Sequence, residues 1–217
     1  VQKFYKINDS VDAGIVIIHQ ELALFPDLTI YENIFAGNEI KQGGLINWNK
    51  TVVEANKVLE KVNLRVNPET LVKELGVGKR QLIEIAKALS KDVKLLILDE
   101  PTAALNEDDS ENLLKLIDGL RNQGISCIMI SHKLKEVISI ADSVTVIRDG
   151  QTIVTLSASK NEITEDVIIR NMVGRQIQDI YPKRNKNISD EKVLELKNWS
   201  AYDPKIGRYV AKNVNMY

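Results

Sequence analysis

The chain has 217 residues, 44% hydrophobic and 27% charged, which is enough of each for a globular protein with a packed core. Its 29 basic and 30 acidic residues give a formal net charge of −1, which excludes a general attraction to nucleic acid or to an acidic membrane surface. The single cysteine, Cys127, excludes an internal disulfide, and we interpret it as a buried strand residue in a reducing compartment.

Apolar runs and helical periodicities follow one another in a regular order along the chain. Runs such as GIVIIH and LLIL are apolar without a break, which is typical of strands buried on both faces of a parallel sheet. In chain order we expect a strand at 14–19, helices at 29–35, 51–62 and 79–89, a strand at 95–98, a helix at 109–121, a strand at 125–130, a helix at 133–140, strands at 143–147 and 151–157, and a helix at 163–172. The alternation predicts an α/β fold with a mainly parallel sheet.

Two departures from this alternation divide the chain. The helices between about residues 26 and 90, with the loop KQGGLINWN between the first two, predict an inserted helical subdomain. Residues 176–192 are polar and charged, so we interpret them as a solvated linker rather than a nucleic-acid patch, and the strand-like segments in 193–217 as the opening of another domain. The pair Asp149-Gly150 predicts a tight hairpin turn. No run of eighteen apolar residues occurs, so we expect no membrane-spanning helix.

Two adjacent carboxylates, Asp99 and Glu100, end the strand LLIL. Open parallel sheets bind ligands beyond the carboxyl ends of their strands. There, Asp99 could coordinate Mg²⁺ and Glu100 could polarise a water that attacks the γ-phosphate of a nucleotide. The alternative is that both acids only solubilise the end of the strand.

Polar side chains also follow the first strand and the strand ISCIMI. The amide of Gln20 can offer its oxygen to Mg²⁺ or to the attacking water. The imidazole of His132 can donate to a γ-phosphate, because Ser131 is the more natural cap of the next helix. Taken singly, Gln20 could equally be a surface residue, and His132 could equally cap a helix or pack in the core. The predicted catalytic role of each residue therefore depends on the presence of the others.

The sequence LGVGK, which comprises Leu75, Gly76, Val77, Gly78 and Lys79, places two glycines just ahead of a helix. Free backbone amides and the helix dipole favour an anion at such a position. The alternative is that the glycines only turn the chain.

Taken together and in this order, these motifs resemble the ATP-binding cassette (ABC) proteins over residues 14–175. By that resemblance HQ ends the Q-loop, LGVGK is the signature loop, LLILDE is the Walker B strand, AALN is the D-loop and SHK carries the switch histidine. The resemblance implies a RecA-like P-loop NTPase fold with an inserted helical subdomain, truncated at the N-terminus. It also implies that the chain binds ATP and Mg²⁺. The implied roles are catalysis by Glu100, His132 and Gln20, metal binding by Asp99 and Gln20, and nucleotide binding by Leu75, Gly76, Val77, Gly78, Lys79 and Asn106.

Longer stretches, among them IIHQELALFPDLTIYENIFAGNE and ISHKLKEVISIADSVTVIRDGQTI, resemble the ATPase subunit of bacterial monosaccharide importers of the xylose type, in which two cassettes are fused. The resemblance implies that residues 1–175 are a first cassette without its Walker A region and that 193–217 begin a second. The implied partners are membrane permease subunits, a periplasmic sugar-binding protein indirectly, and a second cassette of the same chain or of a homodimer, with no nucleic acid. It places the protein at the cytoplasmic face of the membrane, with Leu24, Phe25 and Ile30 as candidate permease contacts or, alternatively, as internal packing residues.

Several departures from the family pattern carry expectations of their own. Gly76 stands where the signature has serine, and Ala103 and Asn106 stand where the D-loop has serine and aspartate. We expect the glycine-rich phosphate loop and its strand upstream of Val1, and therefore negligible ATPase activity from this chain alone. The gap left beside the strand that ends at His132 would be closed by the C-terminal strands or by exchange with another copy.

Two other functions remain open on the sequence. One is a non-catalytic binding or assembly module, which the lack of a phosphate loop favours. The other is a soluble cassette protein that acts on DNA or the ribosome, which would predict a basic surface rather than a net charge of −1.

Overall fold

The computed structural model describes residues 2–174 and 194–216. The chain divides into two compact units, Val1–Arg175 and Gln176–Tyr217, which are described separately. The linker predicted at 176–192 lies outside the described residues. The assignment of the two units to a first and a second cassette stays a prediction.

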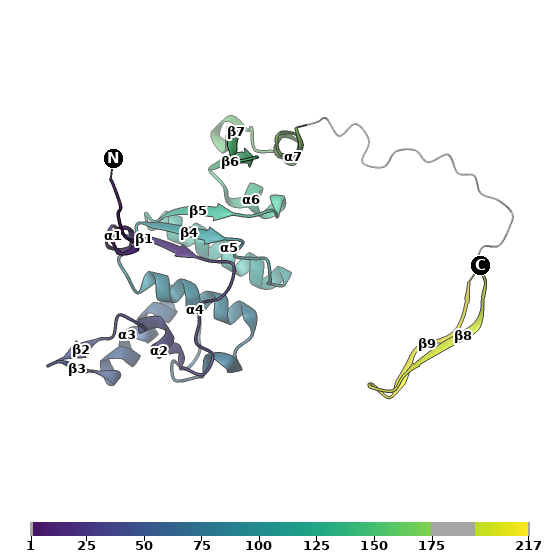
Figure 1. Ribbon diagram of the computed structural model, residues 1–217, viewed down its shortest axis with the longest axis horizontal. Coiled ribbons are helices and arrows are strands. Elements are labelled where there is room, and N and C mark those ends of the chain that lie inside the picture. The colour runs from purple at the N-terminus through teal and green to yellow at the C-terminus, as the bar shows by residue number, and fades with distance from the viewer. Residues whose placement is uncertain (1, 175–193, 217) are drawn as a thin grey trace. The chain divides into compact units, whose positions relative to one another are not determined.

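A three-stranded parallel sheet forms the centre of the first unit (Figure 1). Its strands are β1 (Ile15–Ile18), β4 (Leu95–Asp99) and β5 (Ser126–Ile130), in the order β1-β4-β5. Their carboxyl ends therefore meet at one edge of the sheet, as the apolar runs predicted. The parallel sheet and the α/β class are confirmed.

The two faces of this sheet differ in how far they are covered. Leu96 and Leu98 of β4 are 0% exposed and pack into the main core. On the opposite face Ile17, Ile128 and Ile130 are 48%, 50% and 51% exposed. The register aligns Ile17 with Ile97 and Ile97 with Ile128, so these side chains form one apolar row that no described element of the first unit covers.

The strand β5 has one open edge. It pairs with β4 and with no other strand among the described residues, because β6 (Ser143–Arg148) pairs antiparallel with β7 (Gln151–Ser157) in a separate sheet. The C-terminal strands β8 (Leu196–Asp203) and β9 (Arg208–Met216) pair with each other. The hypothesis that the C-terminal strands, or exchange with another copy, close the gap beside β5 stays a prediction.

The helical subdomain packs against one face of the sheet through α4 (Val77–Leu89). It also contains α2 (Ile30–Phe35) and α3 (Trp48–Lys61), and Ile30 is 0% exposed within its core. Ile30 therefore packs internally and is not a permease contact, whereas Phe25 is exposed. Asn33 is fully buried and ties the preceding loop to α2, because its amide bonds the backbone of Phe25 and the carbonyls of Leu28 and Thr29.

The region predicted as a loop between α2 and α3 contains a small hairpin of β2 (Lys41–Gln42) and β3 (Leu45–Ile46). Gly43 and Gly44 make its turn with φ values of 59° and 85°, the region that a two-residue type I′ turn requires. The helix α3 begins at Trp48, earlier than predicted, because Oδ1 of Asn47 accepts from the backbone N–H of Lys50 at 3.0 Å.

The remaining elements of the first unit include a second hairpin. The turn at Asp149 and Gly150 has φ values of 51° and 75°, so the predicted β6–β7 hairpin is confirmed. A small second core joins Val146, Leu156 and Ile168. The other elements are α1 (Ile7–Asp12), η1 (Val72–Glu74), α5 (Glu107–Asn122), α6 (Leu134–Ile140), η2 (Ala158–Lys160) and α7 (Glu165–Val173). Among the described residues, no helix is long and apolar enough to cross a membrane.

Candidate functional site

Three side chains predicted as catalytic meet where the parallel strands end. Nε2 of Gln20, which follows β1, donates to Oε2 of Glu100 at 3.2 Å. Nδ1 of His132, which follows β5, lies 3.0 Å from the other carboxylate oxygen of Glu100. The Glu100 carboxylate is mostly shielded, whereas the His132 imidazole is 65% exposed. The sheet thus places one carboxylate between an amide and an imidazole from neighbouring strands.

The backbone of Glu100 is in the left-handed region, with a φ of 44°. A non-glycine residue there costs on the order of 1–3 kcal/mol and persists only where its surroundings hold it. The N–H of Glu100 donates to the carbonyl of Ile130 at 2.9 Å, and Pro101 follows at once. This hydrogen bond to the end of β5 fixes the direction in which the carboxylate leaves the sheet.

The predicted magnesium ligands lie at the same edge, on neighbouring strands. Asp99 is the last residue of β4 and is half-buried, and Gln20 is exposed. Among the described residues, no group of three or more His, Cys, Asp or Glu side chains is arranged to hold a metal ion. Oxygen donors such as Asp99 and Gln20 suit Mg²⁺, which commonly takes one or two protein ligands and fills its other positions with phosphate oxygens and water.

The signature loop lies at the beginning of α4. Gly76 is the N-cap residue and carries no capping side chain, and Val77, Gly78 and Lys79 form the first turn. The prediction that both glycines precede the helix is therefore wrong for Gly78. The first N–H groups of a helix have no partner within it, so the loop keeps the amides that an anion requires. No hydrogen bond among the described residues joins this loop to Glu100.

Asn106 caps the helix α5. Its Oδ1 accepts from the backbone N–H of Asp109 at 2.8 Å, and its Nδ2 donates to the Asp109 carboxylate at 3.0 Å. The side chain predicted to touch nucleotide is thus held by a local pair of hydrogen bonds. It remains on the surface, where a ligand can reach its free lone pair.

A partly buried polar network behind Glu100 and His132 was not predicted from the sequence. Oγ1 of Thr102, which is 1% exposed, donates to Oε2 of Glu136 at 2.5 Å. Nζ of Lys133 donates to the carbonyl of Thr102 at 2.7 Å and lies 3.3 Å from Oε1 of Glu136. The network ties the turn after Glu100 to the turn that carries His132. The only signal was the spacing of Lys133 and Glu136 at helical positions i and i+3.

Two of the hollows on the first unit are a cleft beside the candidate site and a hollow at the β2–β3 hairpin. A cleft of about 740 Å³ between α5 and α6 has His132, Lys133 and Glu136 on its wall and Leu105 and Leu114 among its apolar residues. It therefore continues from the edge at which Glu100 lies.

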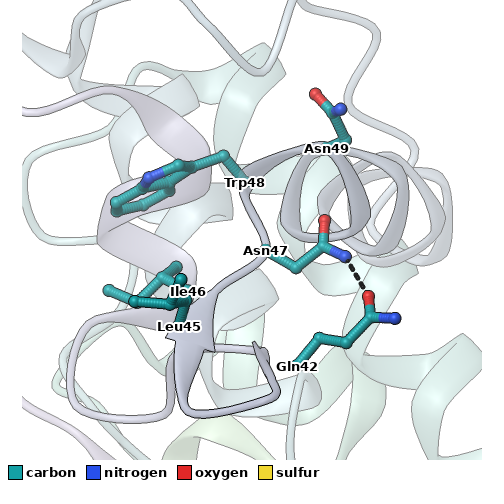
Figure 2. Close-up of a pocket in the computed structure, with 6 residues that line it drawn as sticks. All are labelled: Gln42, Leu45, Ile46, Asn47, Trp48 and Asn49. Carbon is teal, nitrogen blue, oxygen red and sulfur yellow. Dashed lines mark hydrogen bonds between the residues drawn. The ribbon is translucent and has the colours of Figure 1, made fainter.

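The second hollow, of about 380 Å³, lies at the β2–β3 hairpin. Figure 2 shows Trp48, Leu45 and Ile46 on one side and Gln42 and Asn47 on the other, with the two amides joined by a 2.6 Å hydrogen bond. None of the predicted site residues lines it.

Burial raises the pKa of Glu84 and of Cys127, which both lie near the sheet. Burial raises the pKa of Glu84 on α4, and Lys87, the backbone of Ala23 and His19 oppose this shift. One carboxyl oxygen of Glu84 is buried without a hydrogen-bond partner. Burial also raises the pKa of the Cys127 thiol, which fits a packing role rather than a nucleophile.

The fold and the sequence together define the class of protein. Residues 2–103 match the family described as ABC transporter, and the chain belongs to this family. Its fold is that of the family's ATPase domains, with a RecA-like parallel sheet.

Particular relatives are similar over nearly the whole chain. It is 60% identical over 204 residues to the L-arabinose transport ATP-binding protein AraG of Geobacillus stearothermophilus. It is 50% identical over 217 residues to the xylose import ATP-binding protein XylG of Moorella thermoacetica. These matches cover 94% and 100% of this chain but 40% and 42% of the relatives, so the chain spans about two fifths of their length.

Solved structures support the fold alone. The chain matches CbiO1 from Clostridium perfringens, described as part of an ABC transporter complex, with a TM-score of 0.63 and 24% identity. That match covers 79% of this chain and 68% of CbiO1. A nucleotide-free ATP-binding cassette from an ABC transporter also matches with a TM-score of 0.63 and 24% identity, over 77% of this chain and 71% of that one.

Proposed function

We propose that this chain is part of the ATP-hydrolysing, energy-coupling subunit of a bacterial importer of a monosaccharide of the xylose type. The observation that carries the proposal is the Glu100 carboxylate, which accepts from Gln20 and lies 3.0 Å from His132 at the ends of three parallel strands. The names of the relatives support a sugar importer, and they include arabinose as well as xylose, which are both pentoses.

In this proposal each side chain has a distinct role. The Glu100 carboxylate accepts a hydrogen bond from the attacking water and orients it toward the γ-phosphate. Nδ1 of His132 hydrogen-bonds Glu100, which leaves Nε2 for a phosphate oxygen. The imidazole can donate to both partners at once only with a proton on each nitrogen. Gln20 moves from Glu100 to the water or the metal ion. Asp99 and Gln20 hold Mg²⁺, which when bound neutralises charge on the phosphates.

The signature loop and Asn106 serve a second cassette in this proposal. Leu75, Gly76, Val77, Gly78 and Lys79 present backbone amides to a nucleotide held mainly by the opposite cassette, in the same chain or in a homodimer. Because a Cβ on Gly76 would meet nothing within 4 Å, a serine fits there without displacing other atoms. A missing donor at a phosphate site costs about 100-fold or more in rate. Gly76→Ser in a chain with its phosphate loop is therefore expected to raise turnover, and unchanged turnover would count against this role.

The proposed partners follow from the proposal that this chain is part of a sugar importer. They are membrane permease subunits in direct contact, a periplasmic sugar-binding protein acting through them, and no nucleic acid. This places the protein at the cytoplasmic face of the membrane. The exposed Phe25, in the loop between the site and α2, is the candidate for permease contact.

The decisive experiment compares two chains in MgATP calorimetry and in a phosphate-release assay. One is the 217-residue chain, and the other is extended upstream to include a phosphate loop. We expect binding and turnover from the extended chain and negligible activity from the short one. In the extended chain, Glu100→Gln should lower turnover by about 100-fold or more while leaving ATP binding intact. The control is Glu60→Gln, an exposed acid on α3.

The second candidate function is a non-catalytic assembly module. It is favoured by Gly76, Ala103 and Asn106, which replace the serines and the aspartate of the family's signature and D-loop. An extended chain that binds MgATP but shows no turnover above that of its Glu100→Gln variant would establish this function instead.

A further inference from the structure

The two glycines of the signature loop differ in what surrounds them. A Cβ on Gly76 would meet nothing within 4 Å. A Cβ on Gly78 would lie 2.6 Å from Oδ2 and 2.7 Å from Cγ of Asp109. Gly78 lies in the first turn of α4 and is not among the residues with positive φ, so its backbone conformation suits any amino acid. Gly78 is therefore constrained by the Asp109 carboxylate beside it.

The Asp109 carboxylate joins this turn of α4 to the turn before α5. Its Oδ2 accepts from Nδ2 of Asn106 at 3.0 Å, and its backbone N–H donates to Oδ1 of Asn106 at 2.8 Å. The first turn of α4 contains no acidic residue and Gly76 supplies no capping side chain, so a neighbouring carboxylate also suits the dipole of α4. Asp109 is thus packed against one loop and hydrogen-bonded to the other.

The beginning of α4 is itself anchored. Arg80 donates from Nε to the carbonyl of Val72 at 3.1 Å and from Nη2 to the carbonyl of Lys73 at 2.9 Å. These bonds hold the turn that carries Gly78 against η1. A side chain added at Gly78 therefore cannot be accommodated by moving α4 alone, and the strain would fall on Asp109.

We propose that Asp109 is a positioning residue that fixes the Asn106 turn against the signature loop, and that position 78 requires glycine because this carboxylate occupies the space. The functional consequence rests on the proposed function: Asp109 couples two segments that serve nucleotide sites. Asn106 then keeps a fixed place relative to the amides of the signature loop, although the two are distant in sequence.

A cycle of substitutions tests the contact by urea denaturation of the 217-residue chain. With Asp109 present, Gly78→Ala should raise the unfolding equilibrium constant about fivefold or more, because overpacking strains both helices. In an Asp109→Ala background the same change should lower that constant about two- to fivefold, since alanine favours a helix over glycine. The matched control is Gly119→Ala in α5, where a Cβ meets nothing within 4 Å and the change should stabilise in both backgrounds.

The positioning role has its own readout, the NMR resonances of the Asn106 side-chain amide. Gly78→Ala should shift them, Gly119→Ala should not, and Asp109→Asn, which keeps an acceptor, should preserve them better than Asp109→Ala. Equal effects of Gly78→Ala in the two backgrounds, or unmoved Asn106 resonances, would overturn the proposal. Neither readout involves nucleotide, so their failure leaves the proposed function standing, and a lack of ATP hydrolysis leaves the contact standing.

Discussion

Replacing Thr102 by valine tests the polar network behind the candidate site. Valine keeps the shape of threonine but removes the Oγ1–H that donates to Glu136 at 2.5 Å, in a residue that is 1% exposed. A hydrogen bond to a charged group contributes about 1.5–3 kcal/mol, so the free energy of unfolding should fall by about 2 kcal/mol. Urea denaturation followed by circular dichroism gives this value.

The matched control is Thr51→Val, at a position that is also 1% exposed. Oγ1 of Thr51 donates to the carbonyl of Asn47 at 2.9 Å. This acceptor is neutral, and it also accepts from the backbone N–H of Thr51. The expected loss is about 0.5–1 kcal/mol. Equal losses for the two variants would refute the reasoning that the charge of Glu136 strengthens the Thr102 bond.

The same variant should disturb the site. Lys133 adjoins His132 and bonds the Thr102 carbonyl, so loosening the network should move the ring resonances of His132. His19 is the only other histidine and is the internal reference. A loss of stability without a change at His132 would show that the network does not position the imidazole.

Three further outcomes follow from single contacts. Asn33→Ala removes the acceptor of the Phe25 N–H and a fully buried amide that donates to three carbonyls, so it should cost about 3 kcal/mol by urea denaturation, whereas Asn56→Ala on the exposed face of α3 should cost less than about 0.5 kcal/mol. Burial raises the pKa of Glu84, so between the ordinary and the raised pKa its carboxyl is protonated in the folded chain and ionised in the unfolded chain. Its contribution to the free energy of unfolding therefore falls as pH rises above the ordinary pKa. Glu84→Gln should stabilise the chain at about pH 7 and lose that advantage near pH 4. Gly14→Ala, at φ 85° with a Cβ 2.8 Å from the carbonyl of Asp92, should cost about 2 kcal/mol or more, seen as a lower Tm.

The sequence was most informative where buried strands end. Unbroken apolar runs followed by polar residues located Gln20, Glu100 and His132, and a parallel sheet necessarily brings such ends to one edge. The strand periodicity also predicted the β6–β7 hairpin from its Asp149-Gly150 turn. These features are local, so one sequence contains them.

Contacts between helices were not predictable in the same way. Nothing in the spacing of residues indicates that Asp109 of α5 lies against Gly78 of α4, because that contact depends on how the two helices pack. The helix α3 begins at Trp48, behind its capping residue Asn47, whereas the apolar periodicity that indicates the helix begins only at Thr51. The short helix α1 lacks any such periodicity and holds its first turn through Asp9, which accepts from the N–H groups of Tyr5 and Lys6.

The uncovered row of Ile17, Ile97 and Ile128, together with Ile130 and the open edge of β5, has a consequence for handling the chain in solution. An exposed apolar sheet face beside an edge with free backbone groups is a template on which other chains can add strands. The scattering mass of the 217-residue chain should therefore rise with concentration, and stabilising salts such as sulfate should increase the association because they strengthen apolar burial. Charged substitutions at Ile128 and Ile130 should improve solubility before they alter the fold.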